Sequence, residues 1–180
     1  MTPLLYVIPI SLALSSCLAT GVQPIELEQS VALTALADEL ALGPQRDTIY
    51  LLKRLNGTTT QAPDSAVWLE RVLPAQFRAR VPSALFYRYW SANRASAPWG
   101  RFDRVGERPV QWVTELRESS LPSTSGVYSL SRIGFSPTAD SALVEVSFSC
   151  RGLCGSAKLY LYHRGPNGWQ LHRSLRSLVH

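Results

Sequence analysis

The sequence predicts a single α+β domain in which helices come first and an antiparallel sheet follows. Two observations predict it. The spacing of apolar residues is helical in the N-terminal half and changes to the alternation of strands from Val110 onward. A chain of 180 residues, 46% of them hydrophobic, can build one core but is short for two ordinary domains. We therefore expect one domain over residues 25–180, with the N-terminal helices packed on one face of a C-terminal antiparallel β-meander sheet.

Three helices are predicted, over residues 25–42, 65–73 and 82–94. The first repeats leucine at helical spacing and is expected to end before Gly43 and Pro44, which disfavour helix. The third opens with Pro82, a favourable residue in the first turn. We expect its aromatic residues to pack in the core rather than to form a ligand site: Phe86, Tyr87, Tyr89 and Trp90.

Five strands are predicted after the helices, over residues 110–116, 127–135, 142–149, 158–163 and 169–175. A sixth, over 48–55, precedes them, and residues 97–109 are expected to be a loop-rich joint. The connections over 137–140, 150–155 and 164–168 are short, which implies antiparallel pairing of the strands they join.

Alternation within residues 142–149 predicts which side chains face the core. Val144, Val146 and Phe148 share one face and are the expected core residues. Glu145 then points outward, where we expect it to pair with a basic residue on a neighbouring strand.

The first seventeen residues have the pattern of an export signal. Residues 3–16 are apolar and uncharged, and they are too short to span a bilayer, which takes about 20 residues. Leu14, Ser15 and Ser16 precede Cys17 in an order that resembles the bacterial lipobox. We expect residues 1–17 to be a signal peptide with lipobox, Cys17 to be lipidated, and residues 18–24 to be a tether.

Two other fates of this segment remain open. Cleavage after Ala19 would release a soluble secreted or periplasmic protein, and an uncleaved leader would remain as an anchor. All three place the domain outside the cytoplasm. We expect the bacterial cell envelope, with the chain anchored through Cys17 to the outside of the cytoplasmic membrane or to the outer membrane. The membrane is then a partner, and nucleic acid is not expected to be one.

Cys150 and Cys154 are expected to form a structural disulfide. An oxidising compartment favours the pairing of two remaining cysteines, and Gly152 and Gly155 allow the tight turn that a disulfide requires. Such a short ring stabilises the fold by only about 2 kcal/mol, so it fixes local geometry. A redox couple, free thiols and a metal site that includes His163 and His172 are weaker alternatives, and we expect no metal.

Positive charge dominates the C-terminal end of the sequence. No acidic residue follows Glu145, whereas five basic residues do: Arg151, Lys158, Arg164, Arg173 and Arg176. These residues predict a basic surface, either solvated or facing an anionic membrane surface. Arg132, inside a predicted strand, is the candidate contact for an anion or ligand. A salt bridge from Arg132 to Glu145 or Asp103 is the simpler explanation.

The C-terminal half resembles an uncharacterised group of secreted or lipid-anchored bacterial proteins. The likeness covers about 100 residues and includes an S-R-V-G-F strand, a C-G-x-L-C-G turn and a G-x-W hairpin. The matching residues here include Ser131, Arg132, Ile133, Gly134, Phe135, Cys150, Leu153, Cys154, Gly155, Gly168 and Trp169, and Asn93 matches the end of a recurring helix. This chain departs from the group at Ser156-Ala157, where the group tends to have a second glycine. The resemblance implies a β-meander topology and carries no catalytic residues.

The sequence favours a non-catalytic envelope protein that binds or scaffolds an unknown partner. It contains no nucleophile elbow, zinc-protease motif, phosphate loop or dinucleotide fingerprint, so we expect neither an enzyme nor a cofactor. The partner would be an envelope protein or an anionic surface. The alternatives are a small-ligand-binding protein and a small hydrolase with a site between helices and sheet. A hairpin at residues 164–168 would also bring His163 and His172 together.

Overall fold

The computed structural model describes residues 24–42, 46–53, 75, 79, 81–94, 101–115, 126–150 and 155–179. The described elements are, in chain order, α1 (Pro24–Leu42), β1 (Ile49–Leu52), α4 (Ser83–Ala92), β2 (Arg104–Val105), β3 (Arg108–Val113), β4 (Val127–Leu130), β5 (Gly134–Phe135), β6 (Ser141–Ser149), β7 (Gly155–Gly165) and β8 (Gly168–Val179). The α+β class, with helices first and most strands after them, is confirmed. The predicted leader, tether and helix over 65–73 lie outside the described residues.

The strands form one sheet in the order β2-β3-β1-β4-β6-β7-β8, and β5 pairs with β6 beside this path. Neighbours from β4 to β8 are antiparallel, as the short connections predict. β1 is parallel to both of its neighbours, since Tyr50 is opposite Gln111 of β3 and opposite Val127 of β4. The meander is therefore confirmed for β4 to β8, and the sheet as a whole is mixed.

The first strand of the predicted meander does not pair with the second. β3 ends at Val113 and β4 begins at Val127, so the connection over 114–126 is long enough to pass β1. The predicted joint over 97–109 also contains structure, because β2 and β3 form a tight hairpin. Gly106 turns this hairpin with a φ of 59°, a conformation that favours glycine.

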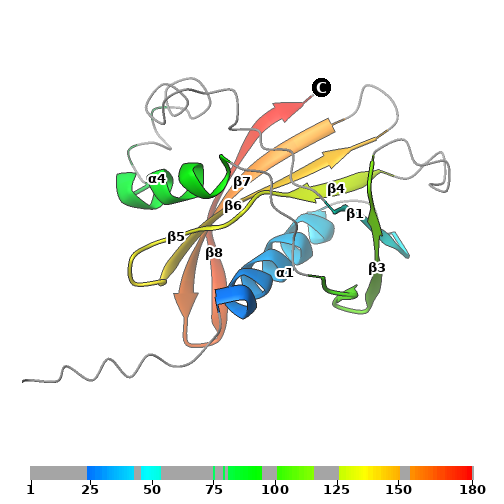
Figure 1. The fold of residues 1–180 in the computed structure, drawn as a ribbon, viewed down its shortest axis with the longest axis horizontal. Helices are drawn as coiled ribbons and strands as arrows, with labels where there is room; N and C mark the ends of the chain where they lie inside the picture. Colours follow the sequence, from blue (N-terminus) through cyan, green and yellow to red (C-terminus); the bar gives the residue numbers. More distant parts are fainter. Residues whose placement is uncertain are drawn as a thin grey trace, which may run out of the picture.

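The two described helices cover opposite faces of the sheet. Val144 of β6 packs with α1, whereas its neighbour Leu143 packs with α4, and successive strand residues point to opposite faces. Figure 1 shows β6 and β7 running between the two helices. We expected the helices to share one face. They separate because β6 is apolar at both alternating positions, with Ala142, Leu143 and Val144 fully buried.

Besides a small cluster formed by Leu52, Val113 and Val127, this arrangement produces one apolar core under each described helix. The larger lies under α1 and contains, among others, Val31, Ala35, Leu36, Ile49, Leu51, Val144, Tyr160 and Tyr162. The smaller lies under α4 and contains Val81, Leu85, Phe86, Tyr89, Trp90, Leu143, Leu159 and Leu161. The prediction that the aromatic residues of α4 pack in the core is right for three of them, whereas Tyr87 is 57% exposed.

The C-terminal half of α1 is joined to β7 by a group of charged and phenolic side chains, which we call the α1 clamp: Asp38, Glu39, Lys158, Tyr160 and Tyr162. The Lys158 ammonium nitrogen lies 2.9 Å from each carboxylate oxygen of Glu39. The Tyr160 hydroxyl donates to Glu39, and the Tyr162 hydroxyl donates to Asp38 over 2.7 Å. Every group of the clamp thus has a partner of complementary character.

The clamp holds both tyrosines in the neutral form. Burial raises the pKa of Tyr160 and of Tyr162 far above the ordinary value, and hydrogen bonds to the two carboxylates raise the pKa of each further. Neutral phenols are hydrogen-bond donors, which is what the carboxylates of α1 require.

Replacing Lys158 with Met tests the clamp. Removal of one partner from a buried ion pair leaves an uncompensated charge, so Lys158→Met should lower the free energy of unfolding by about 3 kcal/mol in urea titrations. Adding Glu39→Gln to that variant removes the unpaired charge and should recover about 1 kcal/mol or more. Unchanged stability of Lys158→Met would show that the clamp contributes little.

Candidate functional site

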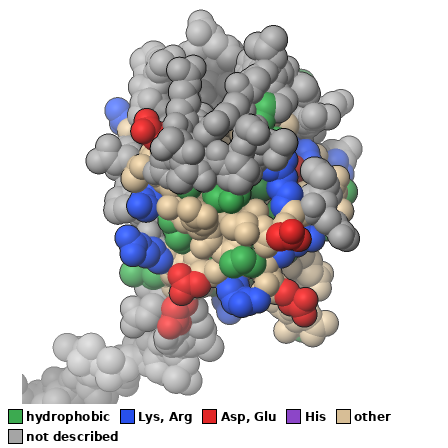
Figure 2. Space-filling view, turned by 90° about the vertical axis from the view of Figure 1, so that its right-hand side faces the viewer, with side chains coloured by type: hydrophobic (Ala, Val, Ile, Leu, Met, Phe, Trp, Pro, Cys, Tyr) green, Lys and Arg blue, Asp and Glu red, His purple; other side chains and the backbone are tan. Residues whose placement is uncertain are grey.

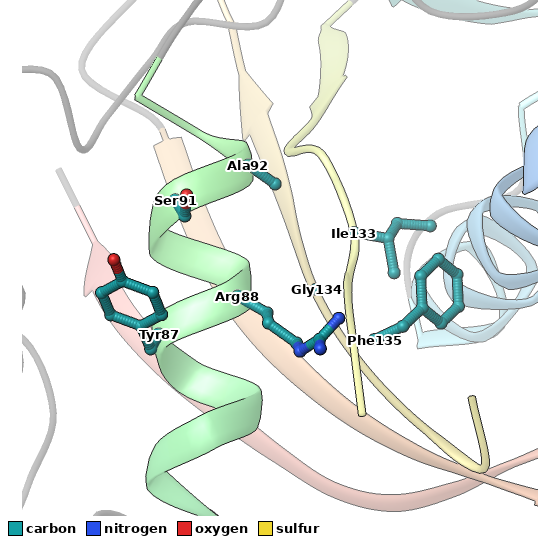
Figure 3. Close-up of a pocket in the computed structure, with 7 residues that line it drawn as sticks. All are labelled: Tyr87, Arg88, Ser91, Ala92, Ile133, Gly134 and Phe135. Carbon is teal, nitrogen blue, oxygen red and sulfur yellow. The ribbon is translucent and has the colours of Figure 1, made fainter. Parts of the chain in front are cut away.

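A groove of about 360 Å³ lies between α4 and the segment that leads into β5. We call it the α4 groove. Figure 3 shows Arg88 reaching from the helix toward Gly134 and Phe135, whereas Tyr87 points away from the strand. The residues that line the α4 groove are Tyr87, Arg88, Ser91 and Ala92 from the helix, and Ile133, Gly134 and Phe135 from the strand segment. The groove therefore combines a cationic group, a hydroxyl, an exposed aromatic ring and open backbone.

Gly134 sets the distance between the helix and the strand. A Cβ at this position would lie 2.5 Å from the Tyr89 backbone nitrogen and Cα. Backbone atoms cannot rotate away as a flexible side chain can, so any larger residue would push α4 from the sheet. The glycine of the S-R-I-G-F segment thus has a packing role at the base of the groove.

Asn93 fixes the strand side of the groove. It is buried at the end of α4, and its amide nitrogen donates to the carbonyls of Tyr89 and Arg132 over 2.8 and 2.9 Å. Its side-chain oxygen accepts a hydrogen bond from the Arg132 backbone N–H over 2.7 Å. One amide side chain therefore satisfies both backbone groups of Arg132 and holds that residue against the helix.

Ser131 substitutes for a missing ladder contact next to this point. Its backbone N–H donates to the Glu145 carbonyl over 2.9 Å, and the Glu145 N–H donates to the Ser131 hydroxyl over 2.8 Å. The hydroxyl takes the place of a backbone carbonyl while the chain leaves β4 and enters β5. Ser131, Arg132 and Asn93 are all among the residues that carry the resemblance, and these contacts give each of them a structural role.

Arg132 turns away from the groove and toward α1. Its guanidinium lies 2.9 Å from a carboxylate oxygen of Glu28. Glu145, one of the two predicted partners, lies on the α4 face. Arg132 lies in an irregular segment where strand alternation does not apply. Burial raises the pKa of Glu28, and the charge of Arg132 opposes that effect.

Glu145 is buried, which contradicts the prediction that it points outward. Only 8% of its surface is exposed, and the Ser147 hydroxyl donates to it over 3.2 Å. Its position in β6 places it on the α4 face with Leu143, near Tyr89. The prediction failed because it assumed that one face of the sheet is solvated. Burial raises the pKa of the Glu145 carboxyl, and with the charge of Glu145 it also raises the pKa of Tyr89.

The predicted proximity of His163 and His172 is confirmed. Their ring centroids are 4.5 Å apart, and both side chains are exposed. The Ser141 hydroxyl lies 2.9 Å from Nδ1 of His163 and donates to Asp140 over 3.0 Å. Hydrogen bonds from Ser136 and Thr138 lower the pKa of the Asp140 carboxyl. The described residues contain no group of three or more histidine, cysteine or acidic side chains arranged for a metal ion.

One of the C-terminal basic residues is paired inside the fold and does not contribute to an open basic surface. Lys158 belongs to the α1 clamp and is neutralised there by Glu39. Arg164 and Arg173 are exposed, whereas Arg151 and the side chain of Arg176 lie outside what the structure describes. Seen from the side of β1 and β3, acidic and basic side chains are interspersed over the described part of the surface (Figure 2).

Two predicted sites, the lipidation site and the disulfide, lie wholly or partly outside the described residues. Cys17 precedes them, and Cys154 falls in the gap between β6 and β7. Cys150 is described at the end of β6 and is not a free thiol. Its pairing with Cys154 remains a prediction. Neither described helix is long and apolar enough to cross a membrane.

Sequence reasoning missed the α4 groove. Arg88 and Ser91 lie on the exposed side of an aromatic-rich helix, and no local motif distinguishes them from solvated residues. A usable signal was the glycine at position 134, since a glycine within a strand often marks the close approach of another backbone.

The fold and the groove define an α+β protein with a mixed sheet, a helix on each face, and an open site beside the second helix. No family model, curated protein or solved structure matches the chain. The resemblance drawn from the C-terminal motifs therefore remains a prediction.

Ionisation of Glu145 should destabilise the fold as the pH rises. Because the pKa of Glu145 is raised in the folded state, the contribution of this residue to stability is greatest below the ordinary pKa of a glutamate. That contribution falls as the pH increases through the raised value. Glu145→Gln cannot ionise, so its free energy of unfolding should increase relative to wild type from pH 4 to pH 7 in urea titrations. A wild-type-to-variant difference that stays constant over this range would contradict the assignment.

Proposed function

We propose that the chain is a non-catalytic cell-envelope protein, exported and anchored through Cys17, that binds an acidic segment of an envelope protein in the α4 groove. The observation that carries the binding part of the proposal is Arg88, which projects into an open groove between an exposed tyrosine and the strand backbone. A guanidinium in such a position suits a carboxylate, because its N–H groups match the two oxygens.

The distribution of charge supports an acidic partner. The sequence from Arg71 to Phe102, which includes α4, contains no acidic residue and six arginines: Arg71, Arg78, Arg80, Arg88, Arg94 and Arg101. The formal charge of the whole chain is +5, so this segment accounts for the entire excess. A concentrated positive charge attracts an acidic partner and speeds its association.

The shape of the groove supports a peptide segment rather than an enclosed small molecule. The groove is open to solvent, and Gly134 contributes backbone to its lining. Arg94 adds positive charge just beyond the end of α4, where its guanidinium lies 5.0 Å from the centre of the Trp90 ring. An extended acidic segment could therefore contact Arg88 and follow the helix toward Arg94.

The positions of Cys150 and Cys154 in the sequence support a disulfide, and a disulfide in turn supports export to an oxidising compartment. Ser149 of β6 is paired with Gly155 of β7, so residues 150–154 close this hairpin, and the two cysteines are the first and last residues of the closing segment. Cysteines in such positions are close enough in sequence to pair across the end of a hairpin in an oxidising compartment.

Intact-mass analysis of the protein from its native envelope fraction tests export and anchoring. We expect a mature chain that begins at Cys17, carries a covalent lipid, and has the mass of a form with two hydrogens fewer than the reduced protein. An intact Met1 with two free thiols would contradict the proposed compartment. Cleavage after Ala19 would contradict the anchor and retain export.

Binding of a fluorescent oligoglutamate peptide tests the groove. We expect Arg88→Glu to weaken binding by about tenfold or more, since a hydrogen bond to a charged group contributes about 1.5–3 kcal/mol. Arg173→Glu is the matched control, because it changes the net charge equally at an exposed residue that does not line the groove. NMR shifts on peptide addition should concentrate at Tyr87, Arg88, Ser91 and residues 133–135.

Equal effects of Arg88→Glu and Arg173→Glu would show that the peptide responds to net charge alone and would contradict the proposed site. The same conclusion follows if peptide-induced shifts are spread over the exposed arginines. Stronger binding of a cell-wall polymer than of the peptide, with the same dependence on Arg88, would keep the groove but overturn the proposed partner.

A further inference from the structure

His163 and His172 lie side by side on β7 and β8, next to the turn between β5 and β6. Both are exposed, and their ring centroids are 4.5 Å apart with the rings inclined by 65°. Neither histidine belongs to the α1 clamp or lines the α4 groove. Two imidazoles at this separation on adjacent strands can both reach one bound ion.

An irregularity in the sheet places His172 in this position. Leu161 is opposite Arg173 and Tyr162 is opposite Leu171, so His172 is the extra residue of a bulge between β7 and β8. A bulge re-aims the side chain that it carries, and bulges are frequent next to functional sites. The contact between His172 and His163 therefore depends on this bulge as well as on the regular pairing of β7 with β8.

A chain of hydrogen bonds orients His163. The Ser141 hydroxyl has a single hydrogen, which it donates to Asp140 over 3.0 Å. With that hydrogen on Asp140, the hydroxyl oxygen is free to accept from a protonated Nδ1 of His163, 2.9 Å away. In the neutral ring with its hydrogen on Nδ1, Nε2 carries the lone pair that binds metal ions. Histidines that bind metals commonly have their second nitrogen held in this way.

Asp140 is itself held by its neighbours. The Ser136 and Thr138 hydroxyls donate to its two carboxylate oxygens over 2.7 and 2.8 Å. Ser141 is buried although the histidines are exposed, so the group that orients the ring is fixed within the fold. The arrangement is more than two adjacent surface histidines, because a buried hydroxyl contacts Nδ1 of one of them and orients its ring.

We propose that His163 and His172 form a surface site for a divalent first-row transition metal ion, bound through Nε2 of His163 and an imidazole nitrogen of His172. Imidazole suits Cu²⁺, Zn²⁺ and Ni²⁺, and affinity is highest for Cu²⁺. Since no third protein ligand joins the pair among the described residues, water or a partner's side chain completes the coordination. This proposal does not rest on the proposed function.

Titration of the metal-free full chain with Cu²⁺ tests the site. We expect one ion per chain in calorimetry and nitrogen hyperfine coupling to two imidazoles in the electron paramagnetic resonance spectrum. His163→Gln and His172→Gln should each lower the affinity by more than about tenfold and leave one coupled nitrogen. Ser141→Ala, which removes the contact with His163 together with the bond from the same hydroxyl to Asp140, should lower the affinity by about tenfold.

His180→Gln is the matched control, because it removes the remaining histidine of the chain and should leave Cu²⁺ binding unchanged. His163→Gln and His172→Gln each replace an exposed side chain with a polar one, so neither should change the circular dichroism spectrum. Undiminished binding by the His163→Gln, His172→Gln double variant would overturn the proposal. Loss of binding in His180→Gln alone would overturn it as well.

Discussion

The structure depends on the way in which two adjacent carboxylates of α1 are accommodated against the sheet. A helix that packs on a sheet ordinarily presents apolar residues to it, but α1 also presents Glu39, which is almost fully buried. Burial of a charge is costly unless the charge is paired and hydrogen-bonded. Lys158 and Tyr160 supply those contacts from β7, and Tyr162 does the same for Asp38. The sequence of β7 thereby specifies where α1 lies.

Contacts continue from this point to the other face of the sheet. Glu28, near the start of α1, holds the side chain of Arg132, and Asn93, at the end of α4, holds the backbone of the same residue. Arg132 therefore links the two helices through the irregular segment between β4 and β5. The α4 groove is built on that segment, so the geometry of an exposed site depends on contacts made under the opposite helix.

Much of the local structure could be predicted from the sequence. The first helix was predicted over 25–42 and is observed from Pro24 to Leu42, and the predicted strands over 127–135 and 142–149 correspond to β4, β5 and β6. These elements are determined by apolar spacing and by turn residues, which are local properties of a sequence. The antiparallel order of the last strands also followed from short connections.

The errors concern contacts between residues that are distant in sequence. Lys158 and Glu145 both looked like surface residues, because alternation shows which side chains share a face but not whether a helix covers that face. The partner of Arg132 lies in α1, more than a hundred residues earlier, and nothing near Arg132 in the sequence indicates it. The groove was missed for the same reason, since two separate elements form it.

The position of β1 has a consequence for how the chain reaches its native state. This four-residue strand comes early in the sequence but lies inside the sheet, with β3 on one side and β4 on the other. Its hydrogen-bonding edges must stay unsatisfied until both later strands have been synthesised and brought to it. Loop-closure entropy opposes such distant pairings, and topologies dominated by them fold slowly. During that interval β1 is an exposed β-forming segment, so in the nascent chain this short strand is open to pairing with the wrong neighbour.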